Sequence, residues 1–308
     1  MRYLLIIFFT VVTVNGWSQQ QQQGFIPIKD GELYYEKKGS GQPLVFLHGV
    51  CLDHRMWQQQ IAYFSQFYTC INIDLRGFGK SSFPGNTAYS FHEDIKTVLD
   101  SLHIKKPVVL VALSMGGKAA VNFSLVYPQR TKALILADVA IDGYRFRDFK
   151  LELIASIALQ KGIDTANQVF LDHPIFATAK RDSAVFGRLR EMILSYSGWQ
   201  WMHKNPIQGL TPPAIEQLKQ IRIPVLIITG EKDIWDFQQT ADILSRHIRH
   251  SVKKVIAEAG HMCNMEKPDA FNRLVSDFLN YGNEQIPPQR FKASINDLEI
   301  NEWERRLK

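Results

Sequence analysis

Short apolar runs of strand-like composition alternate with helical segments from about residue 43 onward, and this alternation limits the folds that the chain can adopt. The runs that indicate buried strands are "QPLVFLHG", "YTCINID", "KPVVLVALS", "TKALILADVA", "IPVLIITG" and "VKKVIAEAGH". The helix expected at about 91–102 carries its apolar residues on one face. Strands that alternate with helices form a mostly parallel sheet with helices on both faces, so the predicted fold class is α/β.

Two departures from this alternation divide the chain. An Asp30-Gly31 turn between two short strand-like runs predicts a β-hairpin near the beginning. Residues 141–210 look helical and are rich in aromatic side chains. An insertion of this length between two strands indicates a helical cap, not a loop. We therefore expect a core formed by residues 25–140 and 211–282, with the cap at 141–210 inserted after the sixth strand.

The beginning of the chain has the pattern of a secretory signal peptide. "MRYLLIIFFTVVTVNGWS" has one positive charge, then an apolar run that is shorter than the about 20 residues of a transmembrane helix, then small and polar residues. We expect residues 1–18 to be a cleaved signal, and the protein to be periplasmic or secreted with no membrane anchor after cleavage. The glutamine-rich residues 19–24 predict a disordered lead-in. Residues 283–308 form a charged C-terminal extension to which we assign no role.

Composition and charge exclude several function classes. Hydrophobic residues make up 45% of the 308 and charged residues 21%, which is typical of a globular protein. The net charge of +6 is mild and the basic residues are scattered, so nucleic acid binding has little support. Neither the histidines nor the three cysteines have the spacing of a zinc site. An odd number of cysteines in an exported chain leaves at least one of them unpaired or paired with another chain.

The stretch "LVALSMGG" at 110–117 passes directly from a strand to a helix through a serine between small residues. An ordinary strand end would instead carry Gly, Asn or Pro in a polar turn. Ser114 is therefore a candidate nucleophile. Three other predicted strand ends carry candidate site residues, namely His48-Gly49-Val50, Asp233 and His261. Loops at the carboxyl ends of parallel strands line the active site of an open α/β sheet, so we expect these residues to converge.

The chain resembles the α/β-hydrolase superfamily, in the serine-nucleophile branch that has a helical cap. The resemblance covers roughly residues 25–282 and depends on five motifs at predicted strand ends. They are "LHGV" at 47–50, "DLRGFGKS" at 74–81, "ALSMGG" at 112–117, "GEKD" at 230–233 and "GHMCNMEKP" at 260–268. The chain order of Ser, Asp and His also matches the triad order of this superfamily. Ala112 departs from the G-x-S-x-G consensus by a single methyl group.

The resemblance implies a role for each candidate residue. Ser114 is the nucleophile, His261 the general base, and Asp233 the residue that orients His261. The backbone N–H groups of Val50 and Met115 form the oxyanion hole. The reaction is acyl transfer to water, with no cofactor and no metal required.

Two aspartates at strand ends, Asp233 and Asp138, are candidates for the acid that orients His261. Asp138 also ends a strand, in "ILADVA", and some members of the superfamily place their acid there. The "GEKD" turn and the chain order favour Asp233, and Asp138 is expected to satisfy backbone amides. Asp74 and Arg76 are expected to brace their loop and not to take part in catalysis.

The predicted function is cleavage of a carboxylic ester or lactone of a small apolar or aromatic molecule. The apolar or aromatic character of the expected substrate follows from the aromatic residues of the predicted cap. The predicted substrate pocket includes His48, Gly49, Trp199 and Trp201. A cofactor-free haloperoxidase (perhydrolase) and a hydrolase of carbon–carbon bonds remain alternatives within the family. A ligand receptor of the same fold with slow turnover is the alternative from another class.

Overall fold

A computed structural model describes residues 21–281 of the chain. The predicted signal peptide at 1–18 and the C-terminal extension from residue 283 lie outside the described residues. Within the described range, no helix combines the length and the apolar character needed to cross a bilayer.

Eight strands form one sheet in the order β1-β2-β4-β3-β5-β6-β7-β8. The strands are β1 (Gln22–Ile28), β2 (Gly31–Lys38), β3 (Pro43–Leu47), β4 (Thr69–Ile73), β5 (Val108–Leu113), β6 (Thr131–Ala137), β7 (Val225–Gly230) and β8 (Ser251–Ile256). The β1–β2 and β2–β4 pairs are antiparallel, and every pair from β4 to β8 is parallel. The predicted mostly parallel sheet is therefore confirmed.

The central strands are apolar along their whole length because helices cover both faces of the sheet. Every residue of β3, β4, β5 and β7 is buried, and Lys132 is the one exposed residue of β6. Strand β8 lies at the edge of the sheet, and it is correspondingly exposed at the two consecutive residues Lys254 and Val255. The pattern of apolar residues in each strand therefore indicates whether the strand lies in the centre or at the edge of the sheet.

Strands β1 and β2 form the hairpin that the Asp30-Gly31 turn predicts. Strand β1 begins at Gln22, so the prediction of a disordered lead-in over 19–24 is wrong for its last three residues. Gln22 and Gln23 pair with β2, and their side chains bond to the hydroxyl groups of Tyr35 and Tyr34. The glutamine-rich sequence does not indicate a strand by itself, because the strand depends on pairing with β2, which comes later in the chain.

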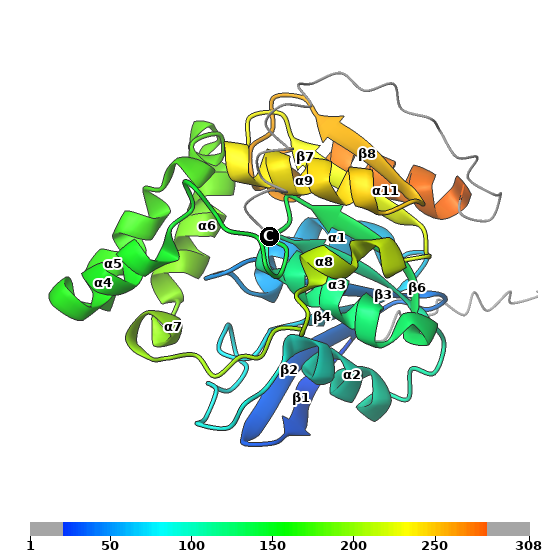
Figure 1. Ribbon diagram of the computed structural model, residues 1–308, viewed down its shortest axis with the longest axis horizontal. Helices are drawn as coiled ribbons and strands as arrows, with labels where there is room; N and C mark the ends of the chain where they lie inside the picture. The colour runs from blue at the N-terminus through cyan, green and yellow to red at the C-terminus, as the bar shows by residue number, and fades with distance from the viewer. Residues whose placement is uncertain (1–20, 282–308) are drawn as a thin grey trace, which may run out of the picture.

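Helices flank the sheet and also form the segment inserted after β6, which confirms the predicted helical insertion (Figure 1). The flanking helices are α1 (Gln58–Phe64), α2 (Phe91–Ser101), α3 (Met115–Val126), α8 (Ala214–Gln217), α9 (Trp235–His247), α10 (Cys263–Glu266) and α11 (Pro268–Tyr281). Helix α3 packs between α2 and α8, whereas α1 packs against α11. The short helix η1 (His54–Trp57) precedes α1.

The inserted segment, residues 141–210, has four α-helices, and they lie to one side of the sheet in Figure 1. They are α4 (Leu151–Lys161), α5 (Ile163–Leu171), α6 (Ser183–Ser195) and α7 (Trp199–Met202), with short 3-10 turns η3 (Pro174–Phe176) and η4 (Ala179–Arg181) between α5 and α6. The buried carboxylate of Asp236, in the first turn of α9, accepts hydrogen bonds from the backbone N–H groups of Arg147, Asp148 and Phe149. This carboxylate fastens the beginning of the inserted segment to the core.

Candidate active site

The loops after β3, β5, β7 and β8 bring the predicted site residues to the carboxyl edge of the sheet. Ser114 follows β5, Asp233 follows β7 and His261 follows β8, and all three are buried. The turn after β3 lies against the serine, because a Cβ added at Gly49 would be 3.4 Å from the Cβ of Ser114. This edge is where ligands bind in open α/β sheets.

Ser114 joins β5 directly to α3 with a backbone φ of 53° and ψ of −119°. A positive φ is uncommon for a residue with a side chain and marks a conformation that the surroundings impose. The turn is held by bonds from Ser114 N to Ala137 O and from the amides of Ala140 and Gly117 to Ser114 O. Close packing explains why position 116 is a glycine, because a Cβ at Gly116 would lie 2.3 Å from a backbone oxygen of β3.

Two backbone N–H groups beside Ser114 are free to receive negative charge. Met115 is the first residue of α3, where the N–H has no partner within the helix and the helix dipole favours an anion. Val50 lies in the turn after β3. Within residues 21–281, neither N–H donates to a side chain or to a backbone carbonyl of a turn or loop. These are the two N–H groups predicted to form an oxyanion hole.

His261 and Asp233 form a buried pair. The distance from His261 Nδ1 to Asp233 Oδ2 is 2.8 Å, and the backbone N–H of Ile234 donates to Asp233 Oδ1 over 2.7 Å. Because the carboxylate holds a proton on Nδ1, the other ring nitrogen is left as an acceptor. His261 Nε2 is buried and has no hydrogen-bond partner within the described part of the chain. The pair therefore presents a free basic nitrogen at the edge that carries Ser114.

Burial sets the protonation of this pair. It lowers the pKa of His261, which keeps the imidazole neutral and able to accept a proton. Burial also raises the pKa of Asp233. The N–H of Ile234 opposes this shift because it stabilises the carboxylate. The ring of His261 also packs on Phe237, with centroids 4.1 Å apart, so an aromatic wall keeps water from one side of the base.

A half-buried glutamate that the sequence did not single out shapes the histidine loop. Glu266, in α10, accepts hydrogen bonds from the backbone N–H groups of Gly260 and Met262, which flank His261. Its distances are 2.8 and 3.2 Å, one to each carboxylate oxygen. The sequence places Glu266 five residues after His261, in "GHMCNMEKP". Only the folded loop shows that the Glu266 carboxylate turns back onto the backbone around His261.

Asp138 does not contact His261 by a hydrogen bond, although it is buried behind the site. Its Oδ1 accepts from Thr229 Oγ1 over 3.0 Å and from Gly230 N over 2.9 Å. The carboxylate that bonds to His261 is that of Asp233, the residue favoured by sequence reasoning. The triad roles remain predictions that the experiments below test.

Other charged or polar residues of the motifs brace loops. His48 uses both ring nitrogens, bonding to Gly49 O over 2.7 Å through Nδ1 and to the N–H of Leu75 over 3.0 Å through Nε2. Asp74 accepts from the backbone N–H groups of His54 and Lys80, and Arg76 pairs with Asp94. None of these side chains is free to act on a substrate as it stands.

The two tryptophans predicted to line the substrate pocket differ in their surroundings. Trp201 is buried within the inserted segment, where Nε1 donates to Asn167 and the ring packs on Phe170 and Tyr196. Trp199 is half-buried and stacks on His203, with centroids 5.0 Å apart. These contacts lie inside the inserted segment and leave the predicted substrate contacts untested.

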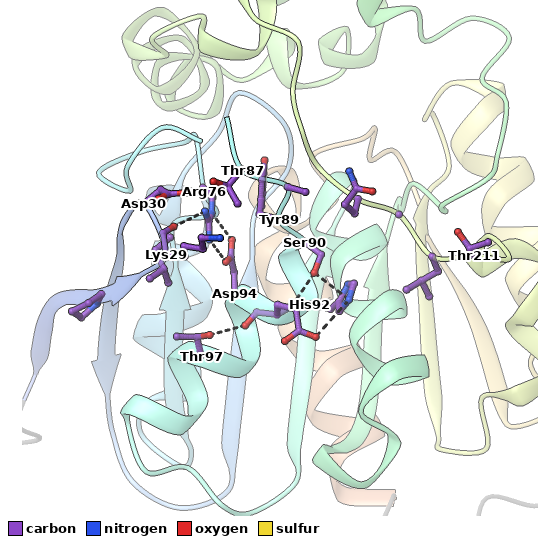
Figure 2. A pocket seen from close by; sticks show the side chains of 17 residues that line it. Lys29, Asp30, Arg76, Thr87, Tyr89, Ser90, His92, Asp94, Thr97 and Thr211 are labelled. Atoms are coloured by element: carbon purple, nitrogen blue, oxygen red, sulfur yellow. Dashed lines mark hydrogen bonds and ion pairs between the residues drawn. The ribbon is translucent and has the colours of Figure 1, made fainter. Parts of the chain in front are cut away.

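Two cavities bear on where a ligand could enter. A cavity of about 380 Å³ lies between the turn after β3 and the inserted segment, and Cys51, Leu52, Phe83, Met192 and Tyr196 contribute to its walls. A larger one, of about 680 Å³, is lined by polar side chains near the beginning of α2, including the ion pair of Arg76 and Asp94 (Figure 2). None of the predicted triad residues lines either cavity. The first is the better candidate for substrate entry because its lining includes Cys51, the residue after Val50 in the turn that follows β3.

Among the described residues, one group of side chains has the spacing of a metal site. Single ligand atoms of Asp53, His54 and Asp74 lie within 4.8 Å of one another. Protein donors already surround these carboxylates, because Arg55 binds Asp53 with a two-pronged contact and His54 Nδ1 lies 2.9 Å from Asp74. We interpret the group as an ion-pair network that anchors η1. All three cysteines of the chain, Cys51, Cys70 and Cys263, are buried free thiols.

A parallel sheet with a strained serine after β5, and with an Asp–His pair supplied after β7 and β8, defines the α/β-hydrolase class. A family model described as the alpha/beta hydrolase fold matches residues 42–268, and the chain belongs to that family. The predicted family is therefore confirmed.

The chain is similar to curated proteins and solved structures of this class. It is 26% identical over 283 residues to an uncharacterized carboxylesterase, nap, of Bacillus subtilis (strain 168), covering 87% of this chain and 90% of that protein. It is 29% identical over 236 residues to 3-oxoadipate enol-lactonase 2 of Acinetobacter baylyi, covering 75% and 86%. A thermophilic esterase from Thermogutta terrifontis superposes with a TM-score of 0.71 at 24% identity, over 85% of this chain and 99% of that one.

Proposed function

We propose that the chain is an exported serine hydrolase that cleaves a carboxylic ester or lactone of a small apolar or aromatic substrate through an acyl-enzyme on Ser114. The observation that carries the proposal is the strained turn at Ser114 together with the 2.8 Å contact that orients His261 on Asp233. Similarity to a carboxylesterase and an enol-lactonase supports the choice of an ester or lactone bond.

In the first half of the reaction, Ser114 Oγ attacks the substrate carbonyl and its proton passes to His261 Nε2. The carbonyl oxygen gains a negative charge that the N–H groups of Met115 and Val50 stabilise. Asp233 stabilises the imidazolium that forms. The bond to the leaving alcohol then breaks, and the alcohol takes the proton from His261, which leaves Ser114 acylated.

In the second half, water attacks the acyl carbon while His261 accepts one of its protons. The tetrahedral intermediate uses the same N–H groups, and the bond to Ser114 Oγ breaks as Oγ takes the proton back. The products are the carboxylic acid and the restored enzyme. For a lactone, the leaving alcohol is part of the same molecule, so the product is a single hydroxy acid.

The preference for an apolar or aromatic substrate rests on the walls around the base and the cavity. Phe237 packs on His261 and also on Phe149 of the inserted segment, with centroids 5.4 Å apart. Phe83, Met192 and Tyr196 contribute apolar surface to the cavity of about 380 Å³, whose lining also includes charged residues such as Asp53, Arg55 and Lys80. Small-molecule sites typically combine apolar surface with polar groups that orient the ligand.

The test is a screen of p-nitrophenyl esters and lactones of graded chain length against purified protein. The wild type is expected to turn over many times and to be labelled by a fluorophosphonate probe, whereas Ser114→Ala is expected to do neither. Equal labelling of both proteins would overturn the role of Ser114. A single slow turnover with tight retention of the ligand would instead favour a receptor.

Export is tested separately from activity. Intact-mass measurement of the secreted or periplasmic protein is expected to give a chain that starts between Trp17 and Gln20. A full-length cytoplasmic product would contradict the proposed export and would leave the proposed chemistry untouched.

A further inference from the structure

Asp138 is buried behind the Asp233–His261 pair in an arrangement that leaves one of its oxygens without a partner. Oδ1 accepts two hydrogen bonds, from Thr229 and Gly230, but Oδ2 has none within residues 21–281. Asp138 is only 1% exposed, so water cannot supply the missing bond from outside. A buried polar atom without a partner carries a large desolvation cost.

The groups around Asp138 come from three segments. Asp233 lies on the turn after β7, and after burial its charge and a side-chain hydrogen bond with it are causes that raise the pKa of Asp138. His261 lies on the loop after β8, and Cys263 lies on α10. Apart from a protonated His261, no cation is among them. Two ionised carboxylates in contact would repel each other strongly in such a site.

We propose that Asp138 is a neutral carboxylic acid at the working pH and that its Oδ2–H donates a hydrogen bond to the Asp233 carboxylate. One proton then resolves both difficulties, because Oδ2 becomes a donor and the second negative charge disappears. The proposal rests on the proposed function, in which Asp233 orients the catalytic base.

The allocation of the proton to Asp138 follows from the donors that each carboxyl receives. Asp233 is in contact with a donor at each oxygen, Ile234 N–H at Oδ1 and the His261 ring at Oδ2, which stabilises its ionised form. Asp138 receives both of its donors on one oxygen, which is the pattern of a carbonyl oxygen beside a hydroxyl. Burial also raises the pKa of Asp138 well above its ordinary value.

Asp138 would thus act through Asp233 as a positioning residue. Its hydroxyl fixes the carboxylate that holds His261, without placing a second anion beside the imidazole. The backbone of Asp138 has a φ of 44°, a conformation that asparagine tolerates better than most residues, so an isosteric amide can be tested at this position.

The competing arrangement is an ionised Asp138 whose Oδ2 accepts from the Cys263 thiol. A thiol is a weak donor, and it would leave two anions adjacent. The two arrangements differ in the effect of Asp138→Asn on the pH profile. An ionised Asp138 raises the pKa of His261, so its removal would move the acid limb of kcat/KM to lower pH. A neutral Asp138 predicts an unchanged acid limb.

The experiment combines infrared spectroscopy with kinetics. Protein labelled with ¹³C at the aspartate carboxyl carbon is expected to show a carboxylic acid C=O band at neutral pH, which Asp138→Asn removes. Asp142→Asn, in the same loop, and Cys263→Ala are expected to retain it. Absence of the band from the wild type, or its persistence in Asp138→Asn, would overturn the proposal. This readout does not depend on ester hydrolysis, so a failure of the proposed function would be recognised separately, by the substrate screen.

The kinetic arm tests positioning. Asp138→Asn is expected to keep kcat within about tenfold of the wild type, because an amide N–H replaces the hydroxyl donor. Losing a hydrogen bond to a charged group altogether would cost about tenfold or more. Asp138→Ala, which lacks a donor, is expected to lose about 10–100-fold in kcat with little change in KM. Wild-type kcat in Asp138→Ala, with the fold checked by circular dichroism, would contradict a positioning role, as would an acid limb shifted by Asp138→Asn.

Discussion

Ser114 has a backbone conformation that costs a residue with a side chain about 1–3 kcal/mol. Four backbone hydrogen bonds, to Ala137, Ala140, Gly117 and Lys118, enforce it. The benefit is positional, because the turn ends β5 abruptly and leaves the hydroxyl at the edge of the sheet, beside the first N–H of α3. Strain at this residue and alignment of the neighbouring donors therefore have the same structural origin.

Asp233→Asn tests whether the contact with His261 sets the state of the base. An amide nitrogen facing Nδ1 favours the tautomer that carries its proton on Nε2, which cannot accept from Ser114. We expect a folded protein whose kcat on a model ester falls by something on the order of 10⁴-fold. Circular dichroism checks the fold. A loss of less than tenfold, with Asp138→Asn the more damaging variant, would identify Asp138 as the acid instead.

The pH dependence follows from the burial of His261. Its pKa is lowered, so the imidazole stays neutral below the ordinary histidine value of about 6.5, and its basic form is lost only as the pH falls further. We expect the acid limb of kcat/KM to have its midpoint below pH 6.5. Initial rates on a neutral ester across the acid range measure it, provided that the protein stays folded. A midpoint at pH 7 or above would show that the base is solvated or ion-paired.

At the scale of elements, α3 lies unusually close to the chain that leaves β6. A Cβ added at Gly117 would lie 2.1 Å from Cγ1 of Val139. Val139 follows Asp138, so this close approach also sets how near the end of β6 comes to the serine turn. Helical glycines usually weaken a helix, and here the absence of a side chain is what allows the two segments to pack.

Gly117→Ala and Gly187→Ala separate these two effects. Both glycines are in helices, but nothing lies within 4 Å of a Cβ at Gly187 in α6. We expect Gly187→Ala to raise the free energy of unfolding by about 0.5–1 kcal/mol. Gly117→Ala is expected to lower it, because overpacking costs about 1–3 kcal/mol and exceeds the helix gain. Urea unfolding measures both. Equal stabilisation by the two substitutions would contradict the close approach.

At the scale of the whole molecule, local patterns in the sequence predict the sheet and the residues at its carboxyl edge. Buried strands are apolar along their whole length, and each motif follows its own strand, so the position of Ser114, Asp233 and His261 needs no long-range information. The pairing of Gln22 and Gln23 in β1 was missed because it depends on partners in β2.

The supporting shell of the site could not be predicted for the same reason. Glu266 turns back onto the histidine loop. Asp138 follows β6 and Asp233 follows the neighbouring strand β7, which comes much later in the chain, and after burial the charge of Asp233 raises the pKa of Asp138. The aromatic content of residues 141–210 is the only reason to predict that Trp201 lines a pocket. Whether an aromatic ring lines a cavity or fills a core depends on how the inserted helices pack. Sequence patterns predict which edge of the sheet carries the candidate site residues, whereas the side chains that hold those residues in place are set by tertiary contacts.

One buried carboxylate of the core, that of Asp236, fastens the beginning of the inserted segment. Asp236 is fully buried, and its two oxygens accept from three successive backbone N–H groups of residues 147–149. In Asp236→Asn one of these oxygens becomes an NH₂ group that faces a backbone donor. We expect the free energy of unfolding to fall by about 1–3 kcal/mol, the cost of leaving a buried group without its partner.

The loss should be local before it is global, because the acceptors serve only the beginning of the inserted segment. Hydrogen exchange in Asp236→Asn is therefore expected to quicken across residues 141–175, while amides of β3 and β5 keep their protection. KM for a model ester should rise more than kcat falls, since the triad residues are not moved directly. Asp242→Asn is the matched control, on the same helix and paired with Lys253 at the surface. Uniform loss of protection in Asp236→Asn, or an equal effect of Asp242→Asn, would show that this carboxylate stabilises the helix and not the junction.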